Sequence, residues 1–212
     1  MNLITIALVL KSGGEYDEEY VTRLRQNVNE SLNFPHQFRI FSDIANESLE
    51  WLPLELGVEG WWSKVEAFRV VDSPAIYLDL DTILVGNLNP LARAILACDE
   101  GTMFMLESFR WSRGATACHN ERFASGIMAW KGDFSFIYSG FDPKTDPVRW
   151  QWDQRYISHM LTTKGIGPRS VQSVQPGVCS YKHDCREGVP VGASVVCFHG
   201  YPRPRDLNWR VS

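Results

Sequence analysis

The chain has 212 residues, of which 44% are hydrophobic and 22% are charged. This composition is typical of a globular protein, and we expect one domain covering residues 1–212. The net charge of −4 and the pI near 5.7 leave no broad basic face, so nucleic acid is not an expected partner. No segment approaches the roughly 20 apolar residues that cross a membrane, so no membrane span is expected.

The cysteine content indicates free thiols in a reducing compartment. The chain has five cysteines and no secretory signal around its apolar run at 3–10, so a cytoplasmic location is expected. Their spacing fits no regular zinc knuckle, and buried thiols are the favoured interpretation. Residue types that bind zinc do gather near the C-terminus, at Cys179, His183, Cys185, Cys197 and His199.

The first 41 residues predict a strand, a helix and a second strand. Residues 3–10 form a continuous apolar run, as expected for a strand covered on both faces, and residues 38–41 are the second candidate strand. Between them, acidic residues that favour a helix N-terminus precede apolar residues at helical spacing. These acidic and apolar positions are Glu15, Asp17, Glu18 and Glu19, then Tyr20, Val21, Leu24, Val28 and Leu32.

The alternation of elements along the remaining chain predicts an α/β sheet. Ser63 is expected to cap a short helix carrying Val65, Phe68 and Val71, and Pro74 is expected to end it. The later elements are expected as a strand at 75–80, a helix at 91–96, strands at 103–106 and 123–130, a helix near 152–161 and a strand at 194–199.

Asp79 and Asp81 close the expected strand at 75–80. In an extended backbone both side chains leave the same face, and two carboxylates this close repel unless one is protonated or a cation lies between them. The carboxyl end of a strand in an open α/β sheet is also where ligands collect. A divalent cation with oxygen ligands is therefore the predicted occupant, although Asp-x-Asp alone is a weak motif.

An alternative interpretation starts from the same aspartates. Residues 79–84 also resemble the first motif of the haloacid-dehalogenase phosphohydrolases, in which the first aspartate is the nucleophile and the second a general acid beside magnesium. That family requires a later lysine and a downstream acidic pair. Lys131 and Asp133 supply the lysine and one acid, but no second acid follows, so this alternative is the weaker one.

The order of several segments resembles the GT-A glycosyltransferases, specifically the family 8-like group related to glycogenin and galactosyltransferases. The resemblance implies a single-domain, Rossmann-like α/β fold with a mixed, mainly parallel sheet flanked by helices. It also implies transfer of a hexosyl unit from a nucleotide sugar, with a UDP-sugar as the expected donor, to a hydroxyl acceptor with retention. Whether the acceptor is a glycan, a lipid or a protein stays open. The segments that carry the resemblance are 3–10, 77–81, 123–128, 153–154 and 198–200.

The resemblance also implies a metal site. Asp79, Asp81 and His199 would hold Mn²⁺ or Mg²⁺, which bridges the donor diphosphate and neutralises charge on the departing group. Leu80 would contact the donor beside them. A lone histidine at a strand end is more often structural than a ligand, and the loop that follows His199 is what favours the ligand role.

Four further residues are assigned to the donor sugar by the same resemblance. Asp153 and Gln154 are the expected catalytic residues, and Asp153 resembles the residue that grips the sugar hydroxyls. Ser125 and Gly126 resemble the strand that faces the sugar, where small residues leave room. A structural interpretation of Asp153 as the N-terminal acid of a helix remains open.

Basic residues are expected to approach the diphosphate. Lys64 is expected at a helix N-terminus, where free amides also favour phosphate. In the resembled family, basic residues on this helix approach the donor, which implies the same role for Lys64 and Arg69. A solvent-exposed role is the alternative for Arg69. In the C-terminal loop, Gly200 permits close backbone approach and Arg203 stands where the family usually has lysine. The family's usual loop is longer between histidine and glycine, so Arg205 is an alternative to Arg203.

The base is expected beside the ends of the first strands, at Leu10, Lys11, Ser12 and Asp43. A non-catalytic binder of nucleotide sugars or carbohydrates is a further alternative, which a turnover assay separates from an enzyme. Eight tryptophans in a chain this size must mostly serve packing. For Trp61 and Trp62, a position in the core and stacking on a sugar ring both stay open, because indole faces serve either role. The candidates for an acceptor groove, to which no role is assigned, are Trp111, Trp150 and Trp152.

Overall fold

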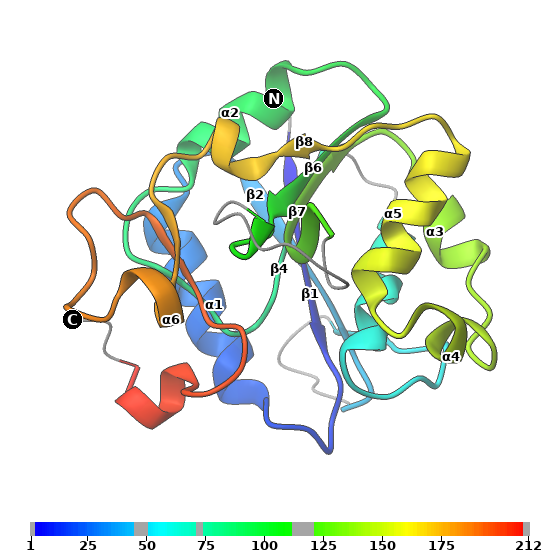
Figure 1. Ribbon diagram of the computed structural model, residues 1–212, viewed down its shortest axis with the longest axis horizontal. Coiled ribbons are helices and arrows are strands. Elements are labelled where there is room, and N and C mark those ends of the chain that lie inside the picture. The colour runs from blue at the N-terminus through cyan, green and yellow to red at the C-terminus, as the bar shows by residue number, and fades with distance from the viewer. Residues whose placement is uncertain (1–2, 45–50, 71–73, 112–120, 210–212) are drawn as a thin grey trace.

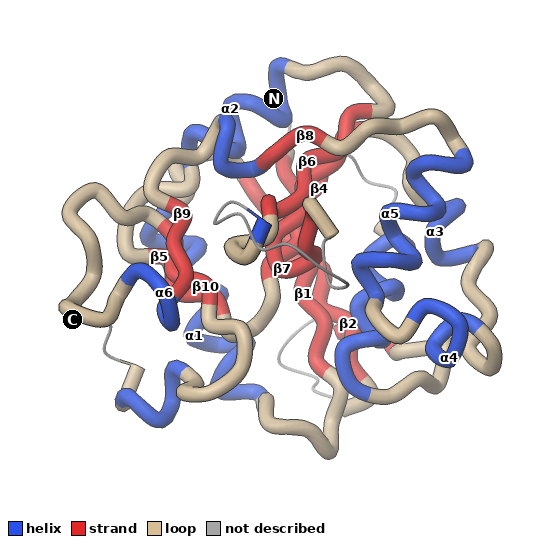
Figure 2. Tube along the Cα trace, in the orientation of Figure 1, coloured by secondary structure: helices blue, strands red, loops and turns tan. Residues whose placement is uncertain are grey.

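The computed structural model describes residues 3–44, 51–70, 74–111 and 121–209 (Figure 1). A seven-stranded sheet with the order β3-β2-β1-β4-β7-β6-β8 forms its centre. These strands are β1 (Ile4–Leu10), β2 (His36–Ser42), β3 (Trp51–Pro53), β4 (Ala75–Leu78), β6 (Thr102–Glu107), β7 (Phe123–Lys131) and β8 (Arg169–Ser170). A second sheet beside α1 (Figure 2) contains β5 (Thr82–Leu84), β10 (Val195–Cys197) and β9 (Val178–Ser180).

The large sheet is mixed and mainly parallel, as predicted. Neighbouring strands from β3 to β4 run parallel, while β7 runs antiparallel to both β4 and β6, and β8 is parallel to β6. Because β7 runs the opposite way, its first residues lie at the same edge as the last residues of β1 and β4. This edge brings together residues that are far apart in the sequence.

Helices cover both faces of the large sheet. The α-helices are α1 (Glu18–Ser31), α2 (Asn89–Ala97), α3 (Phe136–Ser139), α4 (Asp146–Trp150), α5 (Asp153–Thr163) and α6 (Tyr181–Asp184). The 3₁₀ helices are η1 (Gly60–Arg69), η3 (Val171–Ser173) and η4 (Pro204–Leu207). In Figure 1, α1 and α5 lie on opposite sides of the sheet.

The two faces bury separate hydrophobic clusters. In β1, Ile6 and Leu8 pack with α1 and α2, whereas Ala7 and Val9 pack with η1, α3 and α5. All seven residues of β1 are buried, which is why the segment reads as a continuous apolar run. Burying a side chain of this size contributes about 1.5–3 kcal/mol, so both layers hold the central strand in place.

Several predicted element boundaries differ from those of the structure, and one of them reshapes the site. β4 ends at Leu78, so Asp79 and Asp81 lie in a turn rather than in an extended strand, and the Thr82 amide closes this turn by donating to the Asp79 carbonyl at 3.0 Å. The last strand, β10, is shorter than the predicted 194–199. The helix expected after Ser63 begins three residues earlier, at Gly60.

Ser63 therefore lies inside η1, where its hydroxyl donates to the Gly60 carbonyl at 2.8 Å instead of capping the helix. Val71, expected in the same helix, lies outside the described residues. Asp17 is the N-cap of α1 and accepts a hydrogen bond from the Glu19 amide, so Glu15 precedes the first turn. Among the described residues, no helix combines the length and apolarity that a membrane crossing needs.

Candidate functional site

A cavity of about 710 Å³ opens at the edge of the sheet where β1 and β4 end and β7 begins. Side chains from both sheets, η1, α5 and the C-terminal loop line it. The predicted site residues among them are Lys11, Lys64, Asp79, Leu80, Asp81, Ser125, Gly126, Asp153, Gln154, His199, Gly200 and Arg203.

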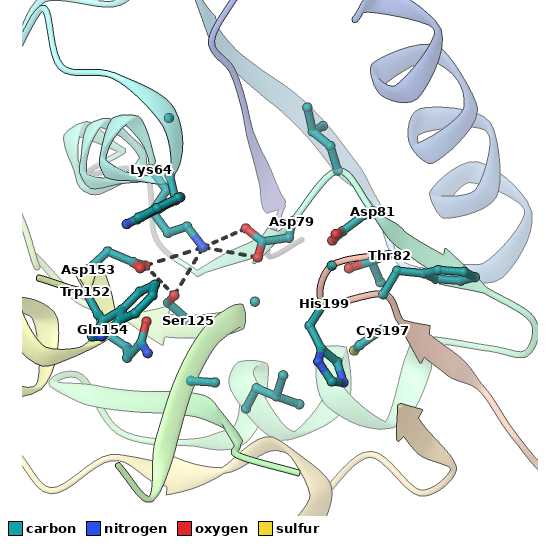
Figure 3. Close-up of a pocket in the computed structure, with 18 of the residues that line it drawn as sticks. Lys64, Asp79, Asp81, Thr82, Ser125, Trp152, Asp153, Gln154, Cys197 and His199 are labelled. Atoms are coloured by element: carbon teal, nitrogen blue, oxygen red, sulfur yellow. Dashed lines mark hydrogen bonds and ion pairs between the residues drawn. The ribbon is translucent and has the colours of Figure 1, made fainter. Parts of the chain in front are cut away.

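A buried lysine joins two carboxylates in this cavity (Figure 3). The Lys64 ammonium lies 2.8 Å from Asp79 Oδ1 and 3.4 Å from Asp153 Oδ2, and it donates to Ser125 Oγ at 3.1 Å. The Ser125 hydroxyl in turn donates to Asp153. Burial alone would lower the pKa of Lys64, but Asp153 and Asp79 raise it above its ordinary value. Lys64 is therefore a fixed cation in the cavity.

Asp81 has separate partners. Its Oδ2 accepts from Tyr16 Oη at 2.7 Å and from Arg203 Nη1 at 2.6 Å. Burial, followed by repulsion from Asp79, raises the pKa of Asp81 to about 7. The aspartate pair thus carries an unfavourable burial of charge that a cation would relieve.

His199 points away from the two carboxylates in Figure 3. Its Nε2 lies 2.6 Å from Ser180 Oγ, and its ring stacks on Phe109 with the centroids 5.7 Å apart. Burial, with the positive charges of Lys182, His183 and Arg110, lowers the pKa of His199 to about 4. The imidazole is therefore neutral at pH 7, the form that binds metal ions.

The donor chemistry of these residues fits Mn²⁺ or Mg²⁺. Carboxylate oxygens at Asp79 and Asp81 suit a hard cation, and Mn²⁺ also accepts a neutral imidazole. Over the described ranges of the chain, no three His, Cys, Asp or Glu side chains lie close enough together to hold a metal ion. His199 must turn from Ser180 to complete such a set. The same finding gives the zinc interpretation no support, and Cys179, Cys185 and Cys197 are buried free thiols.

Four residues assigned to the donor, Leu10, Ser12, Asp43 and Arg69, lie outside the cavity. Leu10 is fully buried in the core, because its side chain points into the layer beneath α1. Ser12 and Asp43 do not line the cavity, but they do meet Lys11: Asp43 accepts from Lys11 Nζ at 2.7 Å and from Ser12 Oγ at 2.6 Å. These bonds outweigh the opposing effect of burial and lower the pKa of Asp43 to about 2.

The position of Arg69 contradicts its predicted role at the donor diphosphate. In a 3₁₀ helix, residues three apart share a face, and η1 directs Trp61 and Lys64 to the cavity while Glu66 and Arg69 share another side. Arg69 Nη1 lies 3.0 Å from Glu66 Oε2 and donates to the Pro53 carbonyl at 2.7 Å. Arg69 therefore holds η1 to the strand edge instead of facing the cavity.

The loop after His199 is fastened to the start of α1. Arg203 pairs with Glu15 as well as with Asp81, whereas Arg205, the alternative to Arg203, pairs with Asp17 and Glu19 and does not line the cavity. Gly200 has a φ of 97°, and a Cβ there would lie 2.6 Å from Lys182 Nζ. The flexible Lys182 side chain can move away from such a Cβ, so the left-handed φ is what favours glycine at this position.

Two tyrosines that hold the aspartates were not predicted from the sequence. Tyr77 Oη donates to Asp79 Oδ1 at 2.7 Å. Tyr77 lies in β4 only two residues before Asp79, and this short spacing is a local signal for the pairing. Tyr16 donates to Asp81 across 65 positions of the chain, and no local pattern indicates that contact.

The phosphohydrolase alternative requires Lys131 beside the aspartates, and the fold separates them. Lys131 ends β7 at the far edge of the sheet, where its ammonium donates to the carbonyls of Leu96 and Cys98 at 3.0 and 2.6 Å. Asp133 caps its own turn by accepting from the Ser135 amide at 2.8 Å. Neither residue lines the cavity, so the fold does not bring together the residues that this alternative requires.

No protein-family model and no curated protein matches the sequence, but solved structures match the fold. Glycosyltransferase GlyE of Streptococcus pneumoniae TIGR4 superposes with a TM-score of 0.61 at 12% identity, over 97% of this chain and 59% of that one. The fold is that of the GT-A glycosyltransferases. Galactosyltransferase LgtC, solved in complex with donor and acceptor sugar analogs, superposes with a TM-score of 0.59 at 10% identity, over 94% of this chain and 88% of its own.

A third similar structure is mouse xyloside xylosyltransferase 1, with a TM-score of 0.55 at 10% identity, over 94% of this chain and 98% of that one. This chain spans 59% of the GlyE chain. The predicted α/β fold class is confirmed by these superpositions, and at such identities they concern the fold.

Proposed function

We propose that this GT-A chain is a metal-dependent glycosyltransferase of the family 8-like group. It moves a hexosyl unit from a nucleotide sugar, a UDP-sugar in the first instance, to a hydroxyl acceptor with retention. The observation that carries the proposal is the position of Asp79 and Asp81 beside the Lys64–Asp153 pair, in one cavity at the edge where the parallel strands end. Ligands of open α/β folds bind at this edge.

The metal site of the proposal uses residues that already lie in the cavity. Asp79, Asp81 and, after it turns, His199 hold Mn²⁺ or Mg²⁺. When bound, the ion would act as a Lewis acid toward the diphosphate. Lys64 supplies a second, permanent positive charge for the phosphate oxygens, and Arg203 a third once its contact with Asp81 is given up.

The sugar-binding part of the proposal involves Asp153, Ser125 and Gly126. Asp153 is buried and already accepts from Ser125, so its carboxylate is oriented to accept from a sugar hydroxyl. A Cβ at Gly126 would lie 3.3 Å from Asp79 Oδ2, and glycine keeps that approach open. Gln154 follows on the same wall and is positioned to hydrogen-bond near the reacting carbon.

The transfer step balances without another reactant. The acceptor oxygen forms a bond to the anomeric carbon as the bond to the diphosphate oxygen breaks. The nucleoside diphosphate leaves with that electron pair, and the acceptor proton passes to it. Retention follows when the acceptor approaches from the side of the leaving group.

The test is release of UDP from UDP-glucose, UDP-galactose and their N-acetylated forms, with Mn²⁺ and after chelation by EDTA. We expect release with at least one donor, lost with EDTA and in Asp79→Asn, and unchanged in the control Asp133→Asn, which removes an exposed carboxylate outside the cavity. Manganese-dependent binding of UDP without turnover of any donor would instead support the non-catalytic binder. Turnover that is indifferent to both EDTA and Asp79→Asn would contradict the proposal.

A further inference from the structure

Two exposed tryptophans stack against each other at the cavity wall. Trp61 is 53% exposed and Trp152 is 38% exposed, and their rings lie nearly parallel, with centroids 5.6 Å apart and planes at 23°. Both side chains line the cavity. Trp62 behaves differently: it is buried and packs on Phe141. Of the Trp61-Trp62 pair, Trp62 thus serves the core and Trp61 faces the cavity.

The pair is held beside the residues assigned to the donor sugar. Trp61 lies three residues before Lys64 in η1, the spacing that places both on one face of a 3₁₀ helix. Trp152 is the N-cap residue of α5 and directly precedes Asp153. In Figure 3, Trp152 lies across the Lys64 cluster from Asp81 and His199. The aromatic surface is therefore at the sugar end of the cavity, away from the proposed metal site.

Polar side chains with planar groups flank the tryptophans. Gln154, Arg155 and Glu121 line the same cavity, and Arg155 is held in place by an ion pair with Glu121 and by a hydrogen bond from its Nη1 to Gln151 Oε1 at 3.3 Å. A pyranose ring presents an apolar face of C–H groups and a rim of hydroxyls. An indole face beside amide, guanidinium and carboxylate groups matches both features.

We propose that Trp61 and Trp152 form the acceptor subsite and that it receives a pyranose ring of a carbohydrate. The ring stacks on the exposed indole surface, and Gln154 and the Arg155–Glu121 pair bind its hydroxyls. This inference rests on the proposed function and names a glycan as its acceptor, because a pyranose ring uses both the flat apolar surface and the planar hydrogen-bonding groups beside it. An acceptor bound there lies next to Asp153, where its hydroxyl reaches the donor sugar.

The test compares Trp61→Ala, Trp152→Ala and Trp152→Phe with Trp111→Ala. Trp111 is 44% exposed and does not line the cavity, so it is a matched control for removing an exposed indole. Calorimetry with UDP and Mn²⁺ measures the nucleotide site. Quenching of tryptophan fluorescence and saturation-transfer NMR, both with UDP and Mn²⁺ present, measure binding of methyl β-galactoside, methyl α-glucoside, lactose and maltose.

We expect wild type to bind at least one of these sugars. Each alanine variant should weaken that binding about two- to tenfold, the range of one aromatic stacking contact, while the Kd for UDP and the melting temperature stay unchanged. Trp152→Phe should retain most of the affinity, and Trp111→Ala all of it.

Three results would overturn the inference while leaving the proposed function intact. Wild type could bind UDP but none of the sugars, or Trp111→Ala could weaken sugar binding as much as the cavity variants do. In the third, the cavity variants weaken the binding of UDP instead, which would mean that the indoles stack on the base. If UDP itself does not bind to wild type, the proposed function fails and this inference fails with it.

Discussion

The ammonium of Lys64 lies 2.8 Å from Asp79 Oδ1 and 3.4 Å from Asp153 Oδ2, so one buried cation connects the end of β4 to the first residue of α5. The three side chains come from different elements, and each is mostly enclosed by protein, with side-chain exposures of 8%, 32% and 4%. Removing the cation leaves two carboxylates without compensation in a poorly solvated site. The pair is therefore a structural requirement as well as part of the proposed donor site.

Lys64→Met should lower the free energy of unfolding by about 3–5 kcal/mol, the usual effect of removing one partner from a buried ion pair. The measurement is urea denaturation followed by circular dichroism. Lys11→Met is the matched control, because Lys11 also pairs with an aspartate but at a more exposed position, where the loss should stay within about 1 kcal/mol. Equal losses in the two variants would show that the Lys64 pair has no special structural role.

Asp81 should make stability fall with rising pH. Its folded pKa of about 7 lies above the ordinary value of 3.8, so between about pH 4 and 7 the unfolded chain releases a proton that the folded protein still holds. The contribution of Asp81 to the free energy of unfolding is complete below about pH 4 and is lost as the pH rises through 7. In EDTA, the melting temperature of wild type should drop relative to that of Asp81→Asn across this window. A constant difference between the two proteins from pH 4 to 8 would contradict the raised pKa.

Arg69→Ala should leave binding of UDP with Mn²⁺ unchanged but destabilise the fold by about 1–3 kcal/mol, because it strips a buried carboxylate, Glu66, of its cation. Glu66 also accepts from the amides of Glu55 and Leu56 and loses none of those bonds in the variant. Calorimetry and urea denaturation on the same preparation measure both effects. Loss of UDP binding at unchanged stability would restore the donor-binding role that the sequence suggested.

His199→Ala should weaken the manganese-dependent binding of UDP by roughly tenfold or more, a loss typical of metal-site residues. His159→Ala is the control, because His159 stacks on Trp150 and does not line the cavity. Electron paramagnetic resonance of Mn²⁺ titrated into each variant measures the affinity. If His199→Ala binds Mn²⁺ and UDP as wild type does, the imidazole stays with Ser180 and the metal is held by the aspartates alone.

Local patterns in the sequence were sufficient to predict most of the fold. Residues 4–10 and 75–78 are mostly apolar because both faces of β1 and β4 are covered, and that requirement is visible in the residue types. The turn at Asp79-Leu80-Asp81 was not visible, because β5, which follows it directly, is defined by pairing with β10, more than 100 residues away.

The candidate site was predicted where its residues are adjacent in the sequence and missed where they meet through the fold. Asp153 and Gln154, or Ser125 and Gly126, carry recognisable local motifs. The partners of Asp81 are Tyr16 and Arg203, which are 65 and 122 positions away, and no spacing rule indicates such pairs. The role of Arg69 was mistaken because the three-residue period of η1 turns it away from the face that carries Lys64.

The metal-dependent nucleotide site is best tested by calorimetric titration of the purified protein with UDP, first with Mn²⁺ and then with EDTA, in wild type, Asp81→Asn and Asp133→Asn. We expect binding to wild type and Asp133→Asn that requires Mn²⁺, and loss of this binding in Asp81→Asn. Binding that is equal in all three proteins and indifferent to EDTA, or no binding to wild type with Mn²⁺ present, would contradict this expectation.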